Sequence, residues 1–114
     1  MFNFFKKTKK EVLNNQAVLI NLDGKNLSDE IYKDYDLSTL EDRLIEIIEK
    51  NKLGEYDGNE FSEEGAIIYI YSSDAENLFT SIKPILQNYP LCKNAKIVIR
   101  KGVPGASQRE EIIN

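Results

Sequence analysis

The chain has 114 residues, a length that fits one domain. Its formal net charge of -4 argues against nucleic-acid binding, which depends on clustered lysine and arginine, and its lack of histidine excludes a Ser-His or Cys-His nucleophile pair. The lone Cys92 cannot form an intramolecular disulfide, and no apolar stretch approaches the roughly 20 residues that span a bilayer. We therefore expect a cytoplasmic protein.

Residues 1–16 carry Phe2, Phe4 and Phe5 next to lysines and then lose any clear period. The aromatic residues come before the basic ones, the reverse of a secretory signal, so we interpret this stretch as a tail or short helix. One alternative is that it lies on an anionic membrane surface, but so few apolar residues would bind weakly. Residues 17–114 are then expected to form a single domain.

The first half of that domain predicts one strand and one helix. Residues 17–22 are apolar and largely β-branched and end at a turn pair, which is typical of a strand. Residues 25–36 are polar, with room for one helical turn. Ser38 and Glu41 have the spacing of a capping box, and the apolar residues after them predict a helix that ends at Gly54.

The second half predicts a hairpin, a second helix and a final strand. Residues 54–61 and 66–72 read as two strands around a four-residue connection, and a second capping box at Ser73 starts the next helix. Pro84 predicts a kink or break near residues 80–83, because proline lacks the amide donor. Residues 96–100 read as the last core strand, and residues 110–113 as a short edge strand.

This succession predicts an α+β, ferredoxin-like βαββαβ fold, an antiparallel sheet with two helices on one face. The usual strand order places strands 54–61 and 96–100 on opposite edges. The first edge and its hairpin are acidic, and the second is flanked by basic residues, so we expect a domain that is electrically polarised across its sheet. The basic set is Lys93, Lys96, Arg100, Lys101 and Arg109.

Alternation of side chains along the strands predicts one uncovered face that mixes tyrosine, arginine and aliphatic residues, as protein interfaces do. This candidate protein-binding face consists of Leu19, Asn21, Ile67, Tyr69, Tyr71, Val98 and Arg100. The alternatives are a half-exposed sheet whose aromatic residues serve strand propensity, or a face covered by the chain's own termini. An RNA-binding face of this kind would need more basic charge than the chain offers.

A second candidate is the acidic edge formed by Glu55, Asp57 and Glu60, whose oxygens suit a divalent cation. A bound cation normally collects more ligands than this strand presents, so we favour a charged edge that discourages pairing with other sheets. Cys92 reads as a packing residue. The glycine-rich stretch 102–107 has no lysine and no following helix, so it reads as a turn and not as a phosphate loop. We expect no cofactor, no catalytic residue and no metal.

Three stretches of the sequence, residues 54–60, 69–79 and 100–106, together resemble a group of small uncharacterised bacterial proteins. The shared patterns are a Gly-Glu-x-Asp-Gly-x-Glu turn, a Tyr-x-Tyr-x-x-Asp-Ala junction and a closing Arg-x-Gly-x-Pro-Gly-Ala. The resemblance covers residues 38–113 and implies a bacterial origin and this domain boundary. It implies no activity. Many members have glycine where this chain has Ser72.

We therefore expect a non-enzymatic protein-binding or regulatory module that recognises a protein partner, or itself as a dimer, through the open sheet face or an exposed strand edge. Immunity proteins that neutralise toxins are one example of this type. The alternatives are a metal-dependent binder or enzyme that uses the acidic edge, and a protein that associates with membranes through its Phe/Lys terminus.

Overall fold

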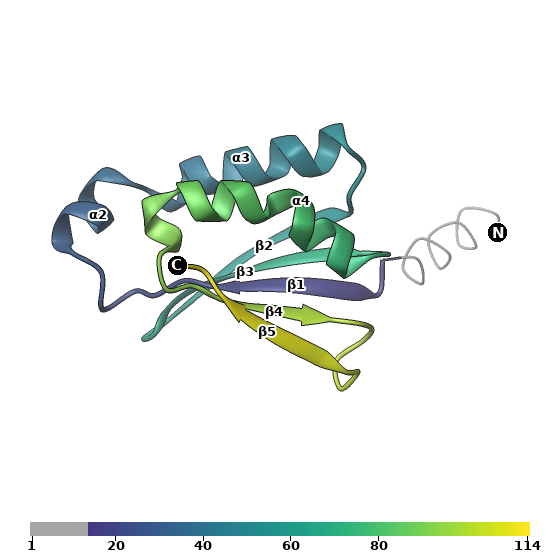
Figure 1. Ribbon diagram of the computed structural model, residues 1–114. Coiled ribbons are helices and arrows are strands. Elements are labelled where there is room, and N and C mark those ends of the chain that lie inside the picture. The colour runs from purple at the N-terminus through teal and green to yellow at the C-terminus, as the bar shows by residue number, and fades with distance from the viewer. Residues whose placement is uncertain (1–13) are drawn as a thin grey trace.

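A computed structural model describes residues 14–114, and within them an antiparallel five-stranded sheet carries two long helices on one face (Figure 1). Most of the predicted tail, with its Phe/Lys stretch, lies outside the described residues. The elements are β1 (Gln16–Asn21), α2 (Asp29–Asp34), α3 (Leu37–Lys50), β2 (Glu55–Ser62), β3 (Gly65–Ser72), α4 (Ala75–Asn88), the short 3-10 helix η1 (Pro90–Cys92), β4 (Lys96–Arg100) and β5 (Gln108–Ile112).

The strand order is β2-β3-β1-β4-β5, which confirms an α+β fold with an antiparallel sheet. A four-stranded ferredoxin-like order is not confirmed, because β5 pairs with β4 and takes the edge that the sequence assigned to residues 96–100. The predicted edge strand at residues 110–113 is present but spans Gln108–Ile112. Among the described helices, none has the length and apolar character needed to cross a membrane.

The core lies between the sheet and the two long helices, α3 and α4. Each helix buries one apolar stripe, and the sheet buries the alternate residues of its three central strands beneath them. Burying a leucine or isoleucine side chain stabilises the fold by about 1.5–3 kcal/mol, so this layer dominates stability. The largest fully buried side chains are Val18, Ile20, Leu40, Leu44, Ile48, Ile68, Ile70, Leu78, Ile82, Leu86, Ile97 and Ile99.

Both helix starts differ from the sequence prediction by one or two residues. The N-cap of α3 is Asp36, which accepts a hydrogen bond from the Thr39 amide at 2.9 Å, and not Ser38. The N-cap of α4 is Asp74, which accepts from the Asn77 amide at 3.1 Å, and not Ser73. Aspartate caps as well as serine, so several polar residues in a row leave the start undecided in the sequence.

Proline 84 does not break α4, which runs unbroken from Ala75 to Asn88. Pro84 lies on the exposed side of the helix, where water can bind the backbone carbonyl that loses its amide partner. Of the predicted kink or break near residues 80–83, the break is therefore wrong.

The connection between β1 and α3 is more ordered than its polar sequence predicts. Ser28 caps the short helix α2, and the Tyr32 hydroxyl donates to the Asp23 carbonyl at 2.8 Å and accepts from the Leu27 amide at 3.1 Å. Asp23 itself accepts from the Lys25 amide at 3.0 Å. These bonds fasten the connection to the end of β1.

The β2–β3 hairpin turns more tightly than predicted, with only Glu63 and Glu64 between its strands. Gly65 has a φ of +141°, and a Cβ there would lie 2.3 Å from the Leu22 carbonyl oxygen. Glycine is required at this point because the hairpin packs directly on the chain that leaves β1.

Candidate functional site: the open face of the sheet

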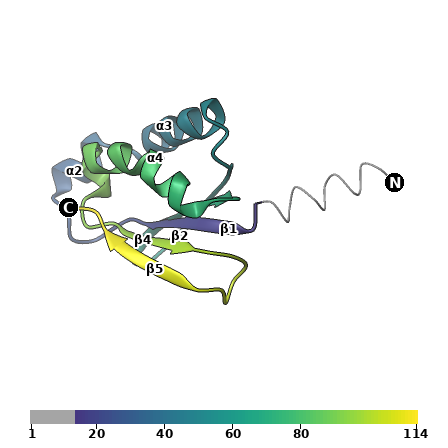
Figure 2. The ribbon, with the colours of Figure 1, turned by 45° about the vertical axis from the view of Figure 1, so that its right-hand side comes forward.

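The face of the sheet opposite α3 and α4 is not covered by either long helix (Figure 2). The predicted alternation holds: Val18, Ile20 and Ile68 are fully buried on the helix side, while Leu19, Asn21, Ile67 and Tyr69 are half-buried on the other side. Val98 is the most enclosed of the predicted open-face residues, at 8% exposure, and Ala17, on β1 like Leu19, is fully buried. We call this surface the open face; it comprises Leu19, Asn21, Ile67, Tyr69, Tyr71, Val98 and Arg100.

Strand register arranges the open face in rows that cross the sheet. Leu19 of β1 stands between Tyr69 of β3 and Val98 of β4 in the middle row. The rows on either side are Tyr71, Ala17 and Arg100, and Ile67, Asn21 and Lys96. Sequence reasoning missed Ala17 and Lys96, although alternation from Leu19 and Val98 identifies both.

The acidic residues of β2 lie at one side of the open face. A bulge between Tyr56 and Gly58 makes Asp57 the extra residue, so Gly58 and not Asp57 stands opposite Tyr69. Asp57 still lines a shallow hollow of about 340 Å³, together with Glu60, Tyr69 and Tyr71. The two predicted sets, the acidic edge and the tyrosines, therefore meet in one place.

The Tyr69 hydroxyl donates a hydrogen bond of 2.6 Å to the Glu60 carboxylate. This bond raises the pKa of Tyr69, and it holds the Glu60 carboxylate over the open face. Glu55 lies beside Tyr71, its partner on the adjacent strand, in the neighbouring row. Within residues 14–114, no three carboxylate or cysteine side chains lie close enough together to hold a metal ion.

The β4 side of the sheet is less positively charged than the sequence predicts, because β5 brings acidic residues to it. Arg109 makes paired bonds of 2.6 Å to Glu76 of α4, and Lys101 lies 3.4 Å from the same carboxylate. The Arg109 guanidinium lowers the pKa of Glu76 to about 2. Within residues 14–114, only the two ends of β4, Lys96 and Arg100, keep basic side chains on the open face itself.

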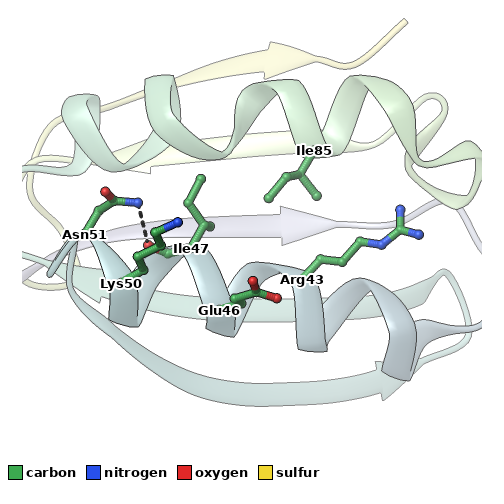
Figure 3. A pocket seen from close by; sticks show the side chains of 6 residues that line it. All are labelled: Arg43, Glu46, Ile47, Lys50, Asn51 and Ile85. Carbon is green, nitrogen blue, oxygen red and sulfur yellow. Dashed lines mark hydrogen bonds between the residues drawn. The ribbon is translucent and has the colours of Figure 1, made fainter.

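On the helix side, a groove of about 400 Å³ runs between α3 and α4 (Figure 3). Ile47 and Ile85 line it, and Arg43 and Lys50 flank it. Asn51 closes one end by donating to the Ile47 carbonyl at 3.1 Å. Sequence reasoning did not predict this groove, because it depends on how far apart the two helices pack.

A third hollow lies at the end of the sheet, beside α2. Its lining is mostly apolar and includes Leu22, Tyr35 and Phe61, and Phe61 is 76% exposed. Sequence reasoning missed this site too, because it is built by the connection over residues 25–36.

Cys92 is completely buried, and burial raises its pKa to about 12. A thiol with this pKa holds its proton at neutral pH, so Cys92 is not poised as a nucleophile.

No family model matches this chain, and neither the search of curated proteins nor that of solved structures found a match.

Proposed function

We propose that the protein is a non-catalytic protein-binding module whose open face contacts the partner. The observation that carries this proposal is the placement of the half-buried Tyr69 and Tyr71 beside aliphatic residues on a face that the two long helices leave uncovered. Tyrosine and arginine next to aliphatic side chains are the composition of interface centres. A small acidic module of this kind is compatible with an immunity-type role in the cytoplasm.

The metal-dependent alternative has less support. Glu60 is engaged by Tyr69, and the acidic residues of β2 do not converge with a third ligand among residues 14–114. The membrane alternative depends on the Phe/Lys stretch, which lies outside the described residues. Neither alternative uses the tyrosines of the open face.

We also propose that the first four strands represent a ferredoxin-like arrangement to which β5 has been added. Support comes from the order β2-β3-β1-β4 within the larger sheet, and from the placement of α3 and α4 on one face. In this proposal β5 is an extension at the β4 edge, and the open face is that of the four-stranded unit.

Affinity capture from the native cell tests the binding proposal. The full chain and its Tyr69→Ala and Tyr71→Ala variants serve as baits, with Tyr35→Ala, on the α2 side and 38% exposed, as a matched control. We expect both open-face variants to lose one specific protein that the wild type and the control retain. If all four baits capture the same proteins in the same amounts, the open face is not the binding surface.

A further inference from the structure

We propose that the partner of the open face is a second copy of this chain, packed face to face around a twofold axis that runs along the strands between β3 and β1. This inference rests on the proposed function, since it uses the same face. The identity of this partner is inferred from the distribution of charge and of side-chain size across the sheet.

The first argument is charge. Glu60 lies on the open face at the β2 side, and Lys96 lies in the same row at the β4 side, three strand spacings or about 14 Å away. A twofold axis along the strands exchanges β2 and β4, so each Glu60 faces Lys96 of the second copy. An axis across the strands would instead place β2 on β2, with like charges opposed.

The second argument is side-chain size. The same axis exchanges β3 with β1, so Tyr69 faces Leu19 of the second copy in the middle row, and Tyr71 lies over Ala17, which is already fully buried in the single chain. In that middle row, Val98 of β4 faces Gly58 of β2. Packed sheets cross at about 30°, so these are neighbouring positions rather than atom-to-atom contacts. The match of Val98 with Gly58 places a side chain opposite a glycine, as close packing of two sheets favours.

The third argument is that the charged side chains are available for such contacts. Lys96 lies 3.9 Å from Glu110 with both side chains about half exposed, and an ion pair of this kind contributes about 0–1 kcal/mol. The hydrogen bond from Tyr69 keeps the Glu60 carboxylate over the face before the second copy arrives. Lys96 can therefore leave Glu110 and pair with Glu60 of the second copy at little cost in free energy.

Pairing through strand edges is the less favourable route for a second copy. The β2 edge carries three acidic residues and the bulge at Asp57, and β5 is Gln-Arg-Glu-Glu-Ile. Charged side chains and bulges are the features that disfavour pairing between strand edges. The open face lacks these obstacles at its centre.

Sedimentation velocity of the full chain from about 5 to 500 µM tests the proposal, a range suited to an interface near the small end of specific ones. We expect a monomer–dimer equilibrium. Glu60→Lys and Lys96→Glu alone should each weaken the dimer at least about tenfold, because each places two pairs of like charges in contact. Glu49→Lys, on the exposed side of α3, is the matched control and should leave the dimer unchanged.

The sharpest measurement mixes the two open-face variants in equal amounts. A heterodimer of Glu60→Lys with Lys96→Glu places opposite charges together at both contacts, so its dissociation constant should return to within about threefold of the wild-type value. Failure of the mixture to associate, or a wild type that stays monomeric at 500 µM, overturns the proposal. A monomeric wild type whose Tyr69→Ala variant still loses a captured protein leaves the binding function standing with a different partner.

Discussion

Ser72 is the one polar residue buried among residues 14–114, at 1% exposure, and its replacement gives the clearest stability prediction. Its hydroxyl donates to the Leu53 carbonyl at 2.7 Å and accepts from the Asp74 amide at 3.0 Å. Ser72 thus joins the end of β3 to the chain entering β2 and to the start of α4. Ser72→Ala leaves both backbone groups without this partner.

The cost follows from the burial of those two groups. A buried carbonyl left without a donor costs about 1–2 kcal/mol, and an amide nearer to solvent about 0.5–1 kcal/mol. We expect Ser72→Ala to lower the free energy of unfolding by about 1.5–3 kcal/mol, measured by urea denaturation followed by circular dichroism. Ser73→Ala, one residue along and exposed, is the control and should change stability by less than about 0.5 kcal/mol. If the two variants are equally stable, the Ser72 hydroxyl does not have the structural role assigned to it.

Three further predictions concern charge, backbone and the thiol. The folded pKa of Glu76, about 2, lies below its ordinary value of 4.5, so its ion pair stabilises the fold above pH 4.5 and loses this effect as pH falls toward 2. An NMR titration should show Arg109→Gln moving this pKa upward, and an unmoved pKa would contradict the pairing. Gly65→Ala should destabilise the fold more than Gly58→Ala, because a Cβ at Gly58 meets no atom within 4 Å; equal unfolding midpoints in urea would contradict the close approach. Cys92 should react with a disulfide reagent at least about a hundredfold more slowly in the native state than in urea, and a fast native reaction would mean that the thiol is accessible.

The sequence predicted the core strands and the open face well because both depend on alternation, a local pattern. Val18 and Ile20 face the helices, and Leu19 between them does not, as the period of two requires. The helix starts were less certain because Asp36 and Ser38 both suit a cap, and only the backbone geometry decides between them.

The elements that the sequence could not define are those that depend on distant contacts. The strand β5 has almost no apolar residue, and it is fastened by ion pairs from Arg109 to Glu76 of α4. Such a pair joins residues far apart in the chain, so no local period reveals it. The hollow beside α2 is similar, because it needs Phe61 and the connection over residues 25–36 to come together.

The bulge at Asp57 has a consequence for how large an assembly can grow. Strands add to a sheet without limit when an edge is straight and uncharged, and the outcome is a fibre. Here the bulge and the acidic residues interrupt the β2 edge, whereas the proposed twofold contact buries the open face of both copies. Association by this route is self-limiting and stops at two molecules.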